Sequence, residues 1–246
     1  MNAKHYFELV GGLPVVSLQQ LTGGRPFVVL SPHPDDESLG AGGLIALARR
    51  EQQQVSVVTV TDGSGSHPHS LSYPRERLIA TRKAELADAL RILGVAFEWA
   101  HHLGLRDTAA PTGGPAFDRA VASVSDVVEA TGAAALFVTW DGDPHCDHKA
   151  ASLLTLGVRR RHPSLRLWAY PVWGWHLPAD EDVAEQQPRG YRIDISSVSA
   201  TKRAAIAAHV SQMTDLIADD PEGFRFNEDM LTPFLGPFEY FLEMSA

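Results

Sequence analysis

Short apolar stretches alternate with longer amphipathic stretches along most of the chain. Phe27 to Leu30 and Val55 to Thr61 have the apolar, β-branched composition of buried strands. Further strands are expected at Val95 to Ala100, Ala135 to Trp140 and Leu165 to Val172. Apolar residues at helical spacing follow the first strand as far as about Gln53. The same spacing predicts helices at Tyr73 to Leu93, Phe117 to Ala130, Asp147 to about Arg160, and Ser199 to Met213. The alternation predicts a Rossmann-like α/β fold, with a mostly parallel sheet and helices on both faces.

The chain shows no change of composition that would mark a domain boundary. We therefore expect a single domain over residues 1–246, with its core at about residues 25–213. Met1 to Gly24 has no sustained period and is expected to be a peripheral lead-in that packs on the sheet. Residues 214–246 are rich in aromatic side chains, which predicts a segment that packs on the core or forms a subunit contact in a homo-oligomer.

Composition and charge narrow the range of partners. The chain has 30 acidic and 21 basic residues, a net charge of -9, which argues against nucleic acid as a partner. No signal peptide and no membrane span is recognised, so a cytoplasmic location is expected. The single cysteine, Cys146, excludes an internal disulfide and a cysteine-rich zinc site.

Two polar loops follow strands of the predicted sheet and carry candidate metal ligands. The first contains Pro32 to Ser38, and the second runs from Asp141 to His148. The carboxyl ends of parallel strands open on one edge of a sheet, where ligands bind, so these two loops can meet. Imidazole nitrogens and a carboxylate oxygen suit zinc and similar divalent ions, and a catalytic site uses about three protein ligands with one position left for water. The residues that would form such a site are His33, Asp36 and His148.

The same two loops resemble the motifs of the PIG-L/LmbE-like family of metal-dependent N-deacetylases. Pro32 to Glu37 reads P-H-P-D-D-E, and His145 to His148 reads H-C-D-H, where the family pattern is H-P-D-H. Weaker similarity extends over about Phe27 to Gln212 and includes Lys202, His209 and Gln212, to which we assign no catalytic role from the sequence. Cys146 stands where proline is usual, and neither of its neighbours is a ligand lost by that change.

The resemblance implies a role for each motif residue. His33, Asp36 and His148 inherit the binding of one zinc ion, and two imidazoles with a carboxylate would equally accept a ferrous ion. Asp35 would be the general base towards a water molecule that attacks the amide carbonyl. His145 would stabilise the oxyanion or protonate the leaving amine, with Asp147 orienting its imidazole.

For Glu37 two interpretations stay open. It either supports the site from behind or is simply an acid favoured in the first turn of a helix, and we treat it as a bystander.

Family substrates imply that the protein removes an acetyl group from an N-acetylated amino sugar or glycoconjugate of the N-acetylglucosaminyl type. Arg82 and Asp107 match positions that resemble family contacts to sugar hydroxyls, although an ion pair with Glu85 or another acid would also explain Arg82. Trp173, in an aromatic segment after a predicted strand, suits stacking on a sugar ring, with core packing as the alternative.

Two other functional classes compete with the deacetylase. An aspartate after the first strand of an α/β sheet can act as a nucleophile on phosphate esters, which would make Asp35 the site of an aspartyl-phosphate. A sugar-binding module without catalysis is the other alternative. The adjacent acids and the matched downstream histidines favour the deacetylase over both.

Overall fold

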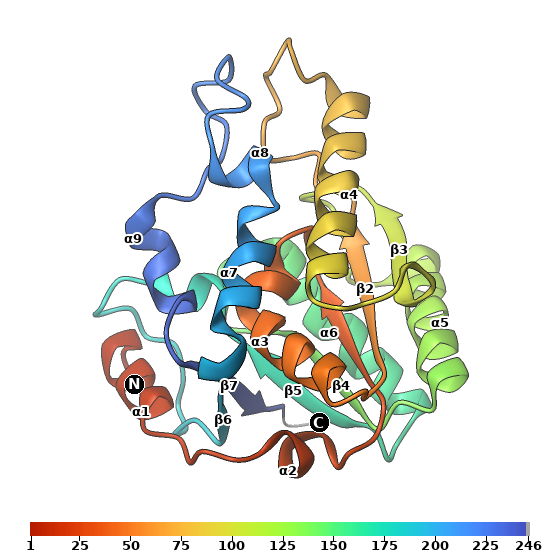
Figure 1. Cartoon of the computed structure of the whole chain (residues 1–246), viewed down its shortest axis with the longest axis vertical. Coiled ribbons are helices and arrows are strands. Elements are labelled where there is room, and N and C mark those ends of the chain that lie inside the picture. The colour runs from red at the N-terminus through yellow and green to blue at the C-terminus, as the bar shows by residue number, and fades with distance from the viewer. Residues whose placement is uncertain (245–246) are drawn as a thin grey trace.

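The computed structural model describes residues 1–244 and places one seven-stranded sheet at the centre of the molecule (Figure 1). The strands are β1 (Phe27–Ser31), β2 (Val55–Thr61), β3 (Ala100–Leu105), β4 (Ala135–Thr139), β5 (Arg166–Tyr170), β6 (Gly190–Asp194) and β7 (Phe238–Glu243), in the spatial order β3-β2-β1-β4-β5-β7-β6. The first five strands are parallel, and β7 runs antiparallel to both β5 and β6. The predicted α/β fold with a mostly parallel sheet is thus confirmed.

Helices cover both faces of the sheet. One face carries α3 (Asp36–Arg50), α4 (Arg75–Ile92) and α7 (Ser199–Ala207), and the other carries α5 (Gly114–Thr131) and α6 (Cys146–Arg161). Alternate side chains of β1 enter the two cores, because Phe27 and Val29 pack with α3 while Val28 and Leu30 pack with α5 and α6. The central strands are therefore apolar along their whole length, as in parallel sheets buried on both sides.

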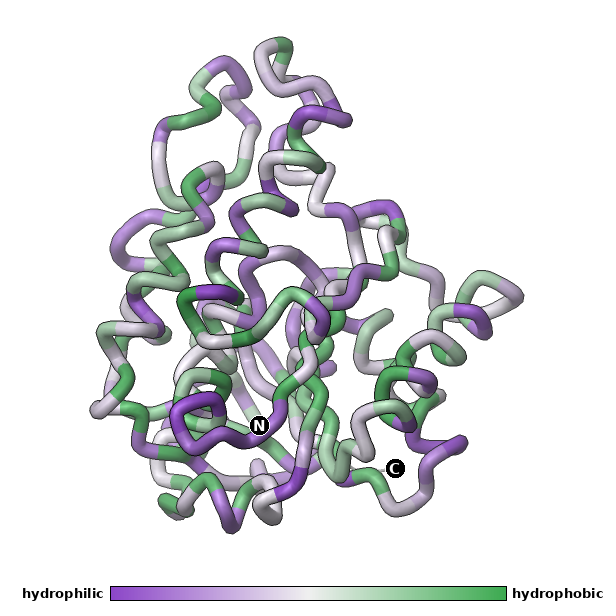
Figure 2. Tube along the Cα trace, turned by 45° about the vertical axis from the view of Figure 1, so that its right-hand side comes forward, coloured by the Kyte–Doolittle hydropathy of each residue, from purple (hydrophilic) through white to green (hydrophobic). Residues whose placement is uncertain are grey.

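Hydropathy along the chain follows this layering. Hydrophobic residues gather along the central strands and on the inner sides of the helices, and hydrophilic residues lie mainly on loops and outer turns (Figure 2). No helix within residues 1–244 is long and apolar enough to span a bilayer.

Several predicted elements differ from the structure. The segment expected as a strand at 95–100 begins with the 3-10 turn η1 (Phe97–Trp99), and strand β3 starts only at Ala100. The helix expected at 199–213 is broken at His209 into α7 and the short α8 (Val210–Met213). The N-terminal lead-in contains two helices, α1 (Ala3–Gly11) and α2 (Leu18–Thr22).

The C-terminal third holds the least expected part of the sheet. After β5 come η2 (Trp173–His176), β6 and η3 (Ser196–Val198), and α8 is followed by α9 (Glu228–Leu231), η4 (Thr232–Phe234) and β7. The aromatic segment predicted to pack on the core or to form a subunit contact thus supplies a strand of the sheet itself, with Phe241 fully buried.

Candidate metal centre and active site

The two polar loops meet at the carboxyl edge of the sheet, next to its centre. β1 and β4 are parallel neighbours, with Leu30 opposite Val138, so the segments that follow them leave the sheet side by side. Each loop leads directly into a helix, α3 at Asp36 and α6 at Cys146. The strand order reverses between β1 and β4, which is the position where open α/β sheets bind their ligands.

His33, Asp36 and His148 converge on one point. Oδ2 of Asp36 lies 3.1 Å from Nδ1 of His33 and 3.3 Å from Nε2 of His148, and all three side chains are buried. Nε2 of His148 is buried without a hydrogen-bond partner among residues 1–244, so its lone pair is available to a ligand. Two imidazole nitrogens and a carboxylate oxygen directed to one place fit a divalent metal ion.

The charges around His148 also favour a cation. Burial alone would lower the pKa of this imidazole, but the Asp36 and Asp143 carboxylates outweigh it and raise the pKa to about 9. Burial alone would likewise raise the pKa of Asp36, yet His148 and His33 hold it well below its ordinary value. The site therefore stabilises positive charge at the position where a metal would sit.

Asp143 is a member of the site that the sequence did not reveal. Its Oδ2 lies 2.8 Å from Nδ1 of His148, and the carboxylate also accepts hydrogen bonds from the backbone N–H groups of Val172 and Gly174. These contacts hold the proton of His148 on Nδ1 and leave Nε2 free to face Asp36. The available signal was a carboxylate five residues before a candidate ligand in the same loop.

The Asp35 carboxylate lies beside the three candidate ligands and is buried. Its backbone has φ 140° and ψ −32°, a conformation that L-residues rarely adopt and that concentrates at functional sites. One carboxylate oxygen accepts a hydrogen bond of 3.0 Å from Nη2 of Arg82. Burial raises the pKa of Asp35 to about 6 even though the Arg82 charge opposes that rise.

Glu37 is not a bystander at the helix start. Its side chain has no exposed surface, and its Oε2 accepts a hydrogen bond of 3.1 Å from the backbone N–H of Asp35. Hydroxyls of Ser31 and Ser38 donate to the same carboxylate, and Nε2 of His209 lies 3.2 Å from it. Glu37 thus ties the strained turn at Asp35 to β1 and to the segment between α7 and α8.

Asp147 contacts the Nε2 end of the His33 ring, and His145 lies against the rings of both His33 and His148, close enough for these three histidines to share a metal ion. The ring of His145 meets the His33 ring edge to face, with centroids 4.6 Å apart. The prediction that the Asp147 carboxylate orients His145 is wrong: Oδ2 of Asp147 lies 3.1 Å from Nε2 of His33, and the carboxylate accepts backbone N–H bonds from Thr108 and Ala110. It is the backbone N–H of Asp147 that donates to Nδ1 of His145.

A cavity of about 200 Å³ opens over these groups and includes the three residues predicted to bind substrate, Arg82, Asp107 and Trp173. Nη1 and Nη2 of Arg82 donate to Gly63 O, Pro34 O and Asp35, so the ion pair expected as the alternative is present, with Asp35 in place of Glu85. Oδ1 of Asp107 lies 3.2 Å from Nε2 of His33. Trp173 packs on Phe224 and Phe226, and with Phe224 it forms an aromatic wall of the cavity.

Three other histidines and one tryptophan line no part of this cavity. His67 is buried beside Ser66, and His69 faces Glu222 at the surface. His101 lines a hollow between β3 and α5, and Trp175 packs against Phe7 and Tyr240.

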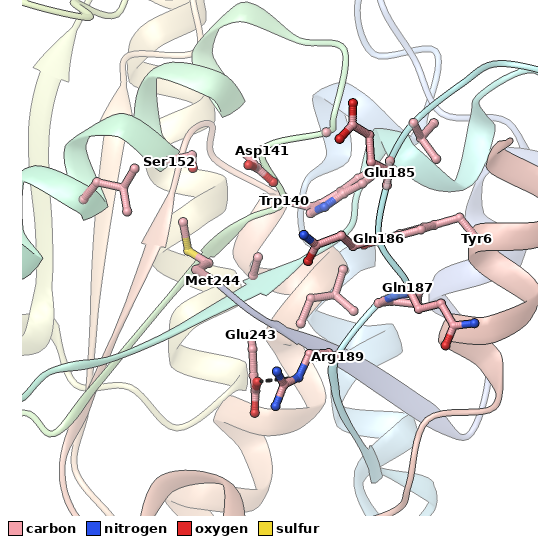
Figure 3. A pocket seen from close by; sticks show the side chains of 17 residues that line it. Tyr6, Trp140, Asp141, Ser152, Glu185, Gln186, Gln187, Arg189, Glu243 and Met244 are labelled. Atoms are coloured by element: carbon pink, nitrogen blue, oxygen red, sulfur yellow. Dashed lines mark ion pairs between the residues drawn. The ribbon is translucent and has the colours of Figure 1, made fainter. Parts of the chain in front are cut away.

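A second hollow, of about 520 Å³, lies away from the candidate ligands (Figure 3). Its walls come from α1, the loop at 183–189 and the end of β7, with Tyr6 stacked on Trp140 and Arg189 paired with Glu243. It shares no lining residue with the cavity over His33 and Asp36. Size therefore does not identify the chemical site in this molecule.

Comparison with known proteins agrees with this geometry. The model of the family PIG-L, described as GlcNAc-PI de-N-acetylase, matches residues 28–158, more than half of the chain. A 1D-myo-inositol 2-acetamido-2-deoxy-alpha-D-glucopyranoside deacetylase of Mycolicibacterium smegmatis is 28% identical, over 85% of this chain and 87% of the relative.

Solved structures share the fold. The N,N'-diacetylchitobiose deacetylase of Pyrococcus horikoshii superposes with a TM-score of 0.67 at 20% identity, over 98% of this chain and 90% of that one. The 4-carboxy-2-hydroxymuconate hydratase GalB of Pseudomonas putida superposes with a TM-score of 0.61 at 21% identity, over 75% and 78%. The same fold thus supports more than one reaction, and the site residues must decide between them.

Proposed function

Because the chain belongs to the PIG-L family of N-deacetylases, we propose that it removes the acetyl group from an N-acetylated amino sugar with a zinc ion held by His33, Asp36 and His148. The observation that carries this proposal is the convergence of both imidazoles on Oδ2 of Asp36, beside the buried carboxylate of Asp35. Ferrous iron is accepted by the same three donors and is an alternative metal.

A zinc ion at this position would lower the pKa of a water molecule and polarise the amide carbonyl. Asp35 then acts as the general base and takes a proton from the attacking water. Its pKa of about 6 leaves it ionised at neutral pH yet more basic than an exposed carboxylate. Arg82 and the strained backbone hold the carboxylate at the cavity.

His145 supplies a hydrogen-bond donor that complements the general base Asp35. Because its Nδ1 accepts the backbone N–H of Asp147, the neutral ring carries its proton on Nε2. Burial lowers the pKa of His145, and the neighbouring His33 and His148 lower it further, so the ring is neutral at pH 7. A neutral imidazole can donate a hydrogen bond from Nε2 to the oxyanion, which is the role this protonation state supports. The proton that Asp35 takes from the attacking water can then pass to the leaving amine. Asp147 serves this arrangement through its backbone N–H and by fixing His33.

The substrate we propose is an N-acetylglucosaminyl compound, the class named in the related deacetylase. Trp173 and Phe224 offer an aromatic wall on which a sugar ring can stack, and Asp107 offers an acceptor for a hydroxyl. Arg82 supports the site by holding Asp35, because both terminal nitrogens of its guanidinium already have protein partners.

The phosphoesterase alternative fits the cavity less well. Asp35, Asp36 and Asp107 all line it, so a phosphate dianion would meet several carboxylates. A mechanism with an aspartyl nucleophile would also give no role to the imidazoles of His33 and His148. A silent sugar-binding module would not require a strained, buried carboxylate beside them.

The Asp35→Asn variant, made in metal-reconstituted protein, tests the proposal. We expect one bound zinc per chain in both proteins, and acetate release from N-acetylglucosamine derivatives lower by about 100- to 10,000-fold in the variant, since a general base contributes that much. Metal content by elemental analysis separates loss of the base from loss of the metal. Asp118→Asn, at an exposed position of α5, is the matched control.

Two results would contradict different parts of this proposal. Full turnover by Asp35→Asn overturns the assignment of the base and leaves the reaction intact. Absence of acetate release by the wild-type protein, with either zinc or ferrous ion and across the sugar series, overturns the reaction itself.

A further inference from the structure

Gln212 presents an unused hydrogen-bond acceptor to the active-site cavity. The residue lies in α8, is 1% exposed and lines the same cavity as Asp35, Asp107 and Trp173. Its Oε1 is buried and has no hydrogen-bond partner among residues 1–244. A buried acceptor without a partner is destabilising, so such atoms are rare and call for an explanation.

The orientation of the Gln212 amide is fixed by its neighbours. Ser211 has one hydroxyl proton and donates it to Oε2 of Glu85 at 2.7 Å. Its oxygen can therefore only accept towards Gln212, which places Nε2 of Gln212 on Ser211 at 3.2 Å and on Ser66 at 3.3 Å. Rotating the amide by 180° would set its oxygen against an oxygen with no proton left to give. Oε1 thus stays free because Glu85 determines the direction of the chain of hydrogen bonds.

Rigid surroundings keep this acceptor in place. The backbone of Gln212 accepts a hydrogen bond from Phe226, and Phe224 donates to the carbonyl of Ser66 across the cavity mouth. Gly223 packs so closely on the His67 ring that an added Cβ would lie 2.2 Å from it. The acceptor is therefore built into a fixed wall.

The ligand suited to this wall is a neutral molecule rich in hydrogen-bond donors. Asp35 and Asp107 add further acceptors, and Nη1 and Nη2 of Arg82 are already bonded to protein oxygens. A hydroxyl can donate to each of these acceptors, whereas a phosphate or carboxylate has no proton to give them. We infer that Gln212 is a specificity-determining residue whose Oε1 accepts a hydrogen bond from one hydroxyl of the sugar that carries the acetamide; this inference rests on the proposed deacetylase function.

Deoxy analogues of the substrate test this assignment. The methyl glycoside of N-acetylglucosamine and its 3-, 4- and 6-deoxy analogues keep the acetamide and differ only in one donor. For the wild-type protein we expect each analogue that lacks a hydroxyl donated to Gln212 or to Asp107 to lose about tenfold to hundredfold in kcat/KM, the loss that corresponds to leaving one buried acceptor unpaired. In Gln212→Leu one of these analogues, the one that lacks the donor to Gln212, should react with nearly the same kcat/KM as the parent, because the acceptor is gone.

Two control variants keep the test decisive. Gln212→Glu retains an acceptor at the same reach and should retain discrimination against that analogue, which a merely structural role would not predict. Gln187→Leu, an exposed glutamine outside the cavity, should behave as wild type. Metal content and the melting temperature of each variant show whether it is folded.

The outcomes separate this inference from the proposed function. Equal discrimination by wild type and folded Gln212→Leu against all three analogues overturns the role of Gln212 and leaves the deacetylase intact. If Gln212→Leu does not fold, loss of discrimination by Gln212→Glu overturns that role. Failure of the wild type to release acetate from the parent glycoside overturns the proposed function and this inference together.

Discussion

Three histidines at the site, His33, His148 and His209, contact carboxylates, and these partners fix the orientations of their rings. His148 is held between Asp143 and Asp36, and His209 lies on Glu37. His33 has Asp36 at Nδ1 and both Asp107 and Asp147 at Nε2. The orientation of each imidazole is therefore set before any ligand arrives, which lowers the cost of assembling a metal site.

Replacement of Asp143 should weaken metal binding without removing a ligand. In Asp143→Asn the amide cannot match the carboxylate at His148 Nδ1 while also accepting from both Val172 and Gly174. We expect zinc affinity to fall by about 10- to 100-fold, as for other residues that orient a metal ligand. Competition with a chromophoric chelator measures this directly. Asp141→Asn, at an exposed position in the same loop, should leave affinity unchanged, and equal affinities of all three proteins would contradict the role of Asp143.

At this scale the sequence predicted the residues that are adjacent in a motif and missed those that act across the fold. His33, Asp35 and Asp36 could be proposed together because they lie within four consecutive positions of the sequence. The contact between Glu37 and His209 joins residues 172 positions apart. The Asp143 carboxylate accepts hydrogen bonds from backbone N–H groups about 30 residues later in the sequence. The direction of Asp147, towards His33 and away from His145, also depends on the β3–α5 loop, which no motif describes.

Helix α3 is the element that positions the site, and it is held in the middle as well as at its start. The backbone N–H groups of Gly43 and Leu44 donate to Glu239 of β7 at 2.6 and 2.7 Å. The same carboxylate accepts from the buried ammonium of Lys202 on α7 at 2.7 Å. Glycine is required where α3 meets the sheet, since a Cβ on Gly40 would lie 2.0 Å from the Tyr170 ring. α3, α7 and β7 thus form one rigid unit behind Asp35 and Asp36.

Neutralising Glu239 should destabilise the whole protein. In Glu239→Gln the buried Lys202 side chain, 2% exposed, loses its counter-charge. We expect the free energy of unfolding in urea at pH 7 to fall by about 3–5 kcal/mol, as when one partner of a buried ion pair is removed.

The matched control for this change is on the same strand. Glu243 is exposed and lies 3.6 Å from Arg189, so Glu243→Gln should change the unfolding free energy by less than about 1 kcal/mol. Equal urea midpoints for the two variants would show that the buried pair contributes nothing beyond a surface contact.

Elements were predictable where a strong period runs without interruption. β1, β2, β4, β5 and the helices between them follow the predicted ranges within a few residues. β3 was misplaced because its residues are only half-buried and carry two histidines and a glycine, so apolar composition does not mark it. β6 and β7 were missed because their burial comes from pairing with each other and with β5, a long-range condition.

On the scale of the whole molecule, the family membership and the deacetylase class expected from the two motifs are confirmed by the family match. The mostly parallel sheet is confirmed as well. The domain limits, a cytoplasmic location and a homo-oligomeric state stay predictions, because they depend on surfaces and surroundings that one chain does not display.

Metal binding should be visible as a change in the stability of the whole chain. Zinc at about 100 times its dissociation constant adds about 2.7 kcal/mol to the stability of the folded state. For a chain of this size that corresponds to a rise of roughly 5–10 °C in the melting temperature. Calorimetry of chelator-treated and zinc-loaded protein measures it, and Asp36→Asn should remove most of the rise. An identical melting temperature in both samples would contradict the metal centre.

The position of β7 has a consequence for how the protein is made. Among the named strands β6 pairs with β7, which is also its link to β5, yet β7 is synthesised after α7, α8 and α9. A nascent chain that has exposed everything up to α9 therefore carries an open edge at β5, a β6 held only by its bridge to Val15, and a Lys202 without its carboxylate. The parallel half of the sheet can assemble during translation, but the sheet can be completed only after β7 has left the ribosome. Until then β5 presents a strand edge open to other chains, and the rate of late synthesis sets how long that exposure lasts.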